Sequence, residues 1–176
     1  MKLRAESVTE ESGQTDCVEF IPPGACIGVA ATDTFVQAFS DSMPCLKSAQ
    51  TTAEAAVVYI PIAIPARDTA SRGAKLTSLE VHYDLDVEGT AGDFGLYKVT
   101  LAADGTIATV ASEIATTCSD TDAELYEADE HTVTLTVTTP AFVGDGEFYY
   151  ALLSITKKTT TDFCFFGALA HYTRAL

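Results

Sequence analysis

Apolar and charged residues alternate along the segment LEVHYDLDV at residues 79–87. Its apolar members share one parity: Leu79, Val81, Tyr83, Leu85 and Val87. Because successive side chains of a β-strand point to opposite faces, this alternation predicts a strand with one buried face and one charged, solvent-facing face. No helix-period pattern of comparable length occurs in the chain. The pattern therefore favours an all-β protein.

Further runs of strand character follow one another at intervals of roughly 10 to 15 residues, the spacing typical of β-sandwiches and jelly rolls. Turn signals separate them, and Asp104-Gly105 predicts a hairpin. The predicted strands cover residues 17–21, 56–64, 76–87, 94–101, 106–112, 131–139, 147–156 and 162–172. We expect an antiparallel β-sandwich, a jelly-roll-like domain, with an extended N-terminal arm.

Proline predicts the place of one strand in its sheet. Within residues 56–64 every second residue from Val58 is aliphatic, and Pro61 falls on the other parity. Because proline cannot donate a hydrogen bond to a sheet ladder, we expect this strand at an edge.

The residues expected to be largely buried in the core are Val81, Leu85, Leu96 or Tyr97, Val133, Leu135, Leu152 and Phe165.

The first 55 residues differ from the rest in composition. Residues 1–16 are polar and predict a tail, and residues 25–55 are rich in Ala, Ser and Thr, with few large aliphatics to build a core. We therefore expect a tail and extended arm over residues 1–55, with one or two short strands between 25 and 55. This arm would pack on a sandwich domain over residues 56–176 or on a neighbouring subunit.

The 25 acidic residues outnumber the 10 basic ones, for a formal net charge of −15. This charge repels nucleic-acid phosphates and anionic membranes, and no apolar run approaches the roughly 20 residues of a spanning helix. We expect neither nucleic acid nor membrane as a partner.

The N-terminal residues lack the apolar core of a secretory signal, which favours synthesis in a cytosol. The five irregularly spaced cysteines then fit small, reduced, mostly buried residues, with a Cys17–Cys26 bridge as the alternative.

Two acidic segments are candidates for a metal site. Asp120, Asp122 and Glu124 recur like the start of a calcium loop, but Leu125 stands where an EF-hand turn needs glycine. The charged residues of the 79–87 segment would share one strand face: Glu80, His82, Asp84 and Asp86. A solvated loop and a solvated strand face are the commoner uses of such residues. We expect no metal and no cofactor.

Histidine placement argues against catalysis. His82, His131 and His171 each fall in a predicted strand or at its edge, rather than in a loop beside a candidate nucleophile. The sequence motifs of serine hydrolases, zinc proteases and phosphate-binding loops do not occur. We therefore expect no enzymatic activity.

The last two predicted strands are apolar on both parities. A two-layer sandwich buries one face of each strand, so the second face needs a cover, either the arm or another subunit. The aromatic residues here fit a core or a subunit interface, and alternatively a platform for sugars. We expect a homo-oligomer, with a trimer as the first guess. The candidate interface residues are Phe148, Tyr149, Tyr150, Leu153, Phe163, Phe165 and Phe166.

Several segments follow one another in a recognisable order. A strand ending in proline is followed by GAKLTSLEVHYD, DFGLYKVTL and HTVTLTV, and then by EFYYALLSI and FFGALAHYT, in which tyrosines recur. From residue 59 to 172 the chain resembles a β-sandwich domain of bacteriophage virion proteins and other phage-borne or surface-associated sequences. The resemblance implies a non-enzymatic capsid decoration protein, or a tail or fibre component. Such a protein is made in the host cytoplasm and docks in the virion on a major capsid or tail protein.

The alternative function is that of a carbohydrate-binding or adhesion module. Clustered exposed aromatics and a calcium site would be its distinguishing features.

Overall fold

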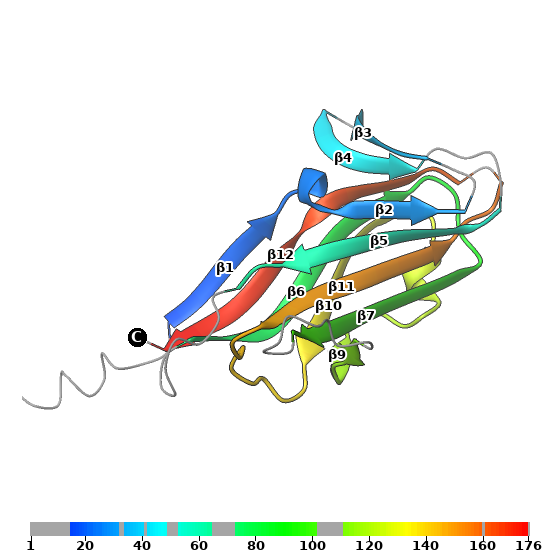
Figure 1. The fold of residues 1–176 in the computed structure, drawn as a ribbon. Helices are drawn as coiled ribbons and strands as arrows, with labels where there is room; N and C mark the ends of the chain where they lie inside the picture. The colour runs from blue at the N-terminus through cyan, green and yellow to red at the C-terminus, as the bar shows by residue number, and fades with distance from the viewer. Residues whose placement is uncertain are drawn as a thin grey trace, which may run out of the picture.

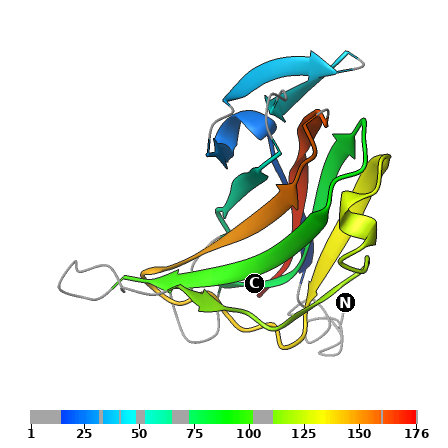
Figure 2. The same cartoon turned by 90° about the vertical axis from the view of Figure 1, so that its right-hand side faces the viewer.

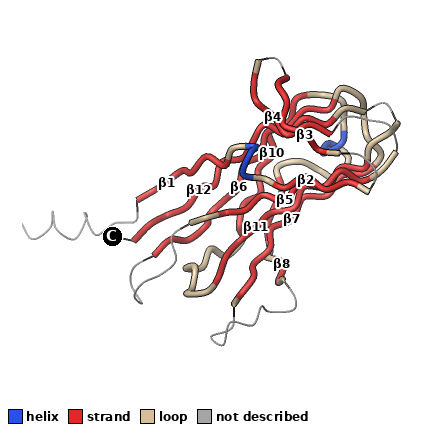
Figure 3. The backbone as a smooth tube through the Cα atoms, turned by 45° about the horizontal axis from the view of Figure 1, so that its top comes forward, coloured by secondary structure: helices blue, strands red, loops and turns tan. Residues whose placement is uncertain are grey.

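The described chain is almost entirely β-strand. A computed structural model describes residues 15–31, 34–40, 42–48, 53–64, 73–101, 111–159 and 161–175. The helices of the described residues are two short 3₁₀ turns, η1 (Pro23–Ala25) and η2 (Glu124–Tyr126) (Figure 3). The strands are β1 (Thr15–Ile21), β2 (Ile27–Ala30), β3 (Phe35–Ser40), β4 (Met43–Ser48), β5 (Ala55–Ile62), β6 (Gly73–Leu85), β7 (Ala91–Thr100), β8 (Ser112–Glu113), β9 (Thr116–Cys118), β10 (Glu130–Val137), β11 (Glu147–Thr156) and β12 (Phe163–Ala175). Over these ranges, no helix is long and apolar enough to cross a membrane.

The strands form two antiparallel sheets that face each other (Figures 1 and 2). The larger sheet has the order β3-β4-β12-β6-β10-β9, with β1 also paired to β12. The smaller sheet has the order β2-β5-β11-β7-β8. Figure 2 shows the layer of β11 and β7 from the side, opposite the layer of β12, β6 and β10. The predicted antiparallel β-sandwich is confirmed.

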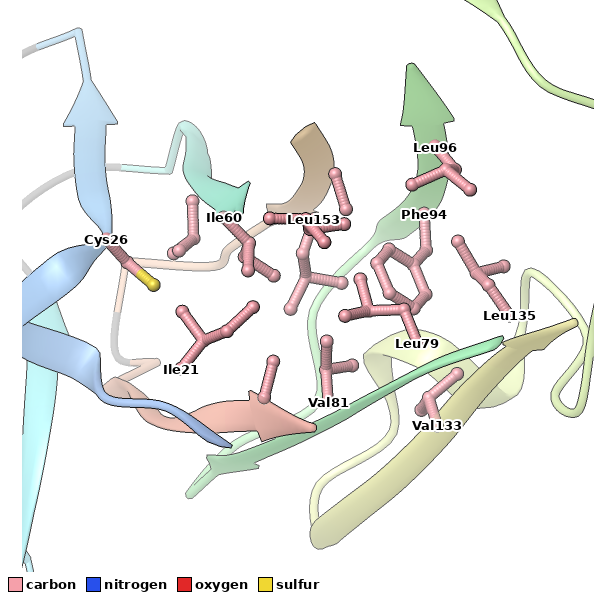
Figure 4. Packing of buried hydrophobic residues seen from close by; sticks show 14 of the residues in the cluster. Ile21, Cys26, Ile60, Leu79, Val81, Phe94, Leu96, Val133, Leu135 and Leu153 are labelled. Atoms are coloured by element: carbon pink, nitrogen blue, oxygen red, sulfur yellow. The ribbon is translucent and has the colours of Figure 1, made fainter. Parts of the chain in front are cut away.

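The core lies between the two sheets (Figure 4). The register of β6 and β10 sets Val81 opposite Val133, and both side chains are fully buried. Apolar residues of the smaller sheet meet them, among them Ile60, Phe94, Leu96 and Leu153. Removing this apolar surface from water is the main favourable contribution to folding. Most of the expected core residues are confirmed as buried: Val81, Leu85, Leu96, Val133, Leu135 and Phe165.

The core prediction for Leu152 is wrong. Leu152 lies on the outer face of β11, opposite Tyr59 on one side and Gly95 on the other. The buried residues of the strand are those of the other parity: Tyr149, Ala151, Leu153 and Ile155. Both parities of β11 are apolar, so alternation does not distinguish its faces. Of the two alternatives on β7, Leu96 is buried and Tyr97 lies on the outer face, half-buried.

The N-terminal segment is built into both sheets. β1 pairs with β12 between Ala168 and Arg174, and β4 pairs with the other end of β12, between Phe163 and Phe165. β2 pairs with β5 of the smaller sheet. Figure 1 shows β1 and the β3–β4 hairpin at the two ends of β12. The arm expected at residues 25–55 therefore holds three strands rather than one or two, and these strands extend the sheets.

The edge position predicted for β5 is wrong, because β2 lies along it. The β2–β5 ladder ends where Ile27 faces Tyr59. Pro61 lies beyond this end, and its partner on the other side is Tyr150 of β11. A proline is tolerated there because β2 does not reach Pro61 and accepts no backbone hydrogen bond from this position.

Residues 1–14, 65–72 and 102–110 lie outside the described residues. These ranges include Pro65, Asp104-Gly105 and most of the strand predicted at 106–112.

The five cysteines are free thiols, so the alternative Cys17–Cys26 bridge is not formed. Cys26, Cys45 and Cys164 are buried, as expected of small apolar residues, whereas Cys118 is exposed. Desolvation raises the pKa of the Cys26 and Cys164 thiols, each to about 12.

Candidate functional site

Three tyrosines gather on the outer face of the smaller sheet. Tyr59, Tyr150 and Tyr97 come from the neighbouring strands β5, β11 and β7, and each lies next in sequence to a core residue of its strand: Ile60, Ala151 and Leu96. Tyr150 lies directly across from Tyr97, and Tyr59 lies across from Leu152, one step along the same face. We call Tyr59, Tyr97 and Tyr150 the tyrosine row.

The rings of the tyrosine row are in contact with one another. The centroids of the Tyr97 and Tyr150 rings are 5.3 Å apart and their planes differ by 15°, which is a stacked pair. The centroids of Tyr59 and Tyr150 are 6.1 Å apart, with planes tilted by 44°. Offset stacking at these separations is favourable beyond the burial of surface, so the neighbours hold one another in place. Tyr59 remains 36% exposed at one end of the row.

Gly95 makes room for the Tyr97 ring. A Cβ atom at residue 95 would lie 3.0 Å from both Cε2 and the hydroxyl oxygen of Tyr97. The ring therefore lies against the backbone of β7, two residues before its own position. A glycine in a strand interior commonly marks such a close approach. The effect is to lay one tyrosine down on the sheet rather than to leave it upright in solvent.

Carboxylates and apolar side chains border the tyrosine row. Glu113 of β8 is the cross-strand partner of Tyr97. Desolvation, followed by the charges of Glu113 and Asp93, raises the pKa of the Tyr97 hydroxyl, which therefore stays protonated at neutral pH. Phe148, two residues before Tyr150 on the same face, is 44% exposed. The surface thus combines aromatic faces, hydroxyl donors and carboxylate acceptors.

The structure separates the seven candidate interface residues. Phe148 and Tyr150 lie on the outer face of the smaller sheet, and Phe166 is half-buried on the larger sheet. The other four point into the sandwich core: Tyr149, Leu153, Phe163 and Phe165. Since this chain already covers those four, a partner cannot reach them, and an interface stays a prediction for Phe148, Tyr150 and Phe166.

No motif in the sequence marks Tyr59 as a site residue, and Tyr97 is expected only as an alternative to Leu96 in the core. Tyr59 does carry a parity signal, because it falls between the buried Val58 and Ile60. Its proximity to Tyr150 depends on the pairing of strands about 90 residues apart in sequence, which no local pattern encodes.

The acidic loop uses its carboxylates for local structure. Glu124 accepts hydrogen bonds from the backbone N–H of Thr121 at 2.7 Å and from its hydroxyl at 2.8 Å. The Glu124 backbone N–H in turn donates to the Thr121 hydroxyl at 3.4 Å, so the two residues are paired reciprocally, as in a capping box, just before the η2 turn. The hydrogen bond from the Thr121 backbone lowers the pKa of Glu124. Within the described ranges, no three His, Cys, Asp or Glu side chains converge on a point that would hold a metal ion.

The charged face of β6 carries a hydrogen-bonded histidine. His82 Nε2 lies 2.9 Å from Glu80 Oε1, and its Nδ1 lies 3.2 Å from the Thr132 hydroxyl. A carboxylate only accepts, so Nε2 carries the proton that points to Glu80. The order of groups resembles a hydroxyl, histidine and acid triad. However, backbone N–H groups in a sheet point along it to neighbouring strands, which leaves such a face without the outward donors of an oxyanion hole.

No protein-family model matches the chain, and no curated protein matches its sequence. Solved structures that resemble the fold include the CBM29_1 family 29 carbohydrate-binding module from Piromyces equi, with a TM-score of 0.42, 9% identity, and coverage of 89% of this chain and 91% of that chain. Another is the CBM22-1–GH10 region of xylanase 10B from Clostridium thermocellum, with a TM-score of 0.41, 14% identity, and coverage of 88% and 27%. The chain thus spans about a quarter of the xylanase structure. Likeness at this level assigns neither a family nor a ligand.

Proposed function

We propose that this protein binds carbohydrate, with the tyrosine row as the platform for sugar rings. The observation that carries the proposal is the stacked pair of Tyr97 and Tyr150, laid against the sheet over Gly95 and bordered by Tyr59. A pyranose presents C–H bonds on its flat faces and hydroxyls around its edge. An aromatic ring packs against the C–H bonds of the sugar face, while polar groups at the border of the platform bind the hydroxyls.

The polar border supports a sugar rather than a purely apolar ligand. Glu113 lies across from Tyr97 and accepts hydrogen bonds from ligand hydroxyls, and the tyrosine hydroxyls both donate and accept. The protein's net charge of −15 disfavours sulfated and uronic acid-rich glycans through repulsion. The expected ligands are therefore neutral polysaccharides.

Titration calorimetry with neutral oligosaccharides of glucose, xylose and mannose tests the proposal. The variants Tyr97→Ala and Tyr150→Ala should each weaken binding by about tenfold or more, since each removes half of the stacked pair. Tyr172→Ala is the matched control, because Tyr172 is a half-buried tyrosine on β12 of the other sheet. Failure of the wild-type protein to bind any of these sugars contradicts the proposal. Equal loss of binding in the Tyr172 variant contradicts the assignment of the platform.

We propose a virion structural role as the second candidate, in keeping with the resemblance to phage virion proteins. The observation that favours self-association or docking is a set of exposed apolar side chains on the four N-terminal strands: Val18, Phe20, Ile27, Val29, Val36, Phe39 and Met43. Exposed apolar side chains that form a contiguous patch commonly mark protein interfaces. Light scattering coupled to size exclusion tests the homo-oligomer, and co-sedimentation with capsids or tails tests the docking. A monomeric mass and no co-sedimentation would refute this role.

A further inference from the structure

A groove of about 340 Å³ crosses the outer face of the larger sheet, on the opposite side of the sandwich from the tyrosine row. Its walls come from five strands: β1, β4, β12, β6 and β10. The volume falls at the lower end of the range of about 300–1,000 Å³ found for small-ligand sites. A small organic ligand therefore fits the groove.

One wall of the groove is apolar and aromatic. It consists of Phe20, Met43, Pro44 and Phe166. Phe20 is 59% exposed and Met43 is 47% exposed, so their surfaces are open to a ligand.

The backbone holds Phe20 in place. β12 carries an irregularity between Phe165 and Gly167, and Gly167 has a φ of +133°, a region that favours glycine. A Cβ at residue 167 would lie 2.8 Å from the Ile21 carbonyl oxygen and 3.0 Å from the Phe20 ring. The glycine thus lets the end of β1 and its phenyl ring settle onto β12. The backbone of β12 thus fixes the position of Phe20 in the aromatic wall.

The opposite wall is polar and acidic. It contains Thr132, Glu130 and His82, and the His82 ring is fixed between Glu80 and Thr132. Glu130 is exposed at the start of β10. Glu130 and His131 are shared with an adjoining depression of about 260 Å³, whose further lining includes four carboxylates: Asp120, Glu124, Glu127 and Asp129. Among the described residues that line the two depressions, none is lysine or arginine.

We propose that this groove binds a small organic cation that joins an apolar, preferably aromatic, body to one ammonium group. The apolar body packs between Phe20, Met43 and Phe166, and the ammonium lies on the Glu130 side, toward the acidic depression. An ammonium close to aromatic faces and to carboxylates is attracted by both, whereas an anion of the same shape is repelled by the carboxylates. The charge complementarity of the two walls thus selects among ligands of equal size.

The probe is 2-phenylethylamine, titrated into the isotopically labelled full chain and followed by amide chemical shifts. We expect saturable shifts that centre on residues 20, 82 and 132. 2-Phenylethanol has the same ring and no charge, and it should bind about fivefold or more weakly, because it lacks the cation. 3-Phenylpropionate and ethylammonium, which lack the positive charge and the ring respectively, should bind more weakly still. Equal binding of the amine and the alcohol, or no saturable shift with the amine up to about 10 mM, would overturn the proposal.

Variants then locate the contacts. Glu130→Gln keeps the shape of the side chain and removes its charge, so it should weaken binding of the amine severalfold and leave binding of the alcohol unchanged. Phe20→Ala removes an exposed ring and should weaken binding of both. Glu113→Gln and Phe148→Ala are the matched controls on the smaller sheet, and they should leave the amine unaffected. An effect of the control variants equal to that of Glu130→Gln and Phe20→Ala, or shifts confined to the tyrosine row, would overturn the site. The outcome is independent of whether the tyrosine row binds sugar.

Discussion

The hydroxyl of Tyr83 donates a 2.7 Å hydrogen bond to the backbone carbonyl oxygen of Leu125, in the interior of the protein. Tyr83 belongs to β6 and Leu125 to the η2 turn, so this bond ties the acidic loop to the sandwich. The ring of His131 stacks on Tyr83 with centroids 4.6 Å apart and planes within 11°. Burial first, and then the nearby Asp120, raise the pKa of the Tyr83 hydroxyl, which therefore remains a donor at any working pH.

Replacing Tyr83 by Phe should lower the free energy of unfolding by about 1–3 kcal/mol, because the Leu125 carbonyl then stays buried without its donor. Urea unfolding of the wild type and the variant measures the change. Tyr59→Phe, at a partly exposed position, is the control and should stay within about 0.5 kcal/mol of the wild type. Equal effects of the two substitutions would contradict a structural role of the Tyr83 bond.

Leu135→Ala should cost about 2–5 kcal/mol, since Leu135 is almost completely buried in the core. Leu152→Ala should cost clearly less, because Leu152 lies on the outer face of β11. Thermal and urea unfolding of both variants test the assigned strand faces. If Leu152→Ala proved the more damaging substitution, the inward face of β11 would be assigned wrongly.

Gly95→Ala should weaken carbohydrate binding by about tenfold, or about 1.4 kcal/mol, because the new Cβ displaces the ring of Tyr97 from the sheet. The unfolding free energy should change less than the affinity, since the atoms that must move belong to the Tyr97 side chain rather than to the backbone. Calorimetry with a bound sugar, together with a melting curve, separates the two effects. Unchanged affinity would argue that the ring position does not matter for binding.

Glu124 links the stability of the η2 turn to pH. Its pKa is lowered in the folded protein from an ordinary value of 4.5, so its stabilising effect is present above that value and is lost as the pH falls through the folded pKa. Glu124→Gln should therefore melt earlier than the wild type at neutral pH. The difference should shrink as the pH is lowered below 4.5. A difference in melting temperature that does not change with pH would exclude the carboxylate as its source.

Thiol labelling distinguishes buried from exposed cysteines. Cys118 is exposed and should react first with a thiol-directed dye in the native protein. Cys26 and Cys164 should react after unfolding, because burial both shields their thiols and raises each pKa to about 12, which suppresses the reactive thiolate. Mass spectrometry of the labelled peptides gives the order. Rapid native labelling of Cys26 would contradict its placement in the core.

Local alternation of apolar and polar residues determines part of this structure directly from the sequence. The pattern around Val81 and Leu85 predicts both a strand and its buried face, and the structure confirms both. This works because one face of β6 meets the core and the other meets solvent, so a shift by one residue would bury its charges. The lack of a long apolar run likewise predicts no spanning helix.

Where both faces of a strand are apolar, the tertiary structure decides. Leu152 and Leu153 are chemically identical neighbours, and the pairing of β11 with β5 and β7 places one outside and the other in the core. Tertiary structure likewise decides the places of β1, β4 and β2, because β1 and β4 pair with β12 and β2 pairs with β5, none of which is adjacent in sequence. The tyrosine row depends entirely on such pairing. Tyr59, Tyr97 and Tyr150 carry no shared motif, and they meet because non-local ladder hydrogen bonds set the register of three strands, which short-range periodicity does not record.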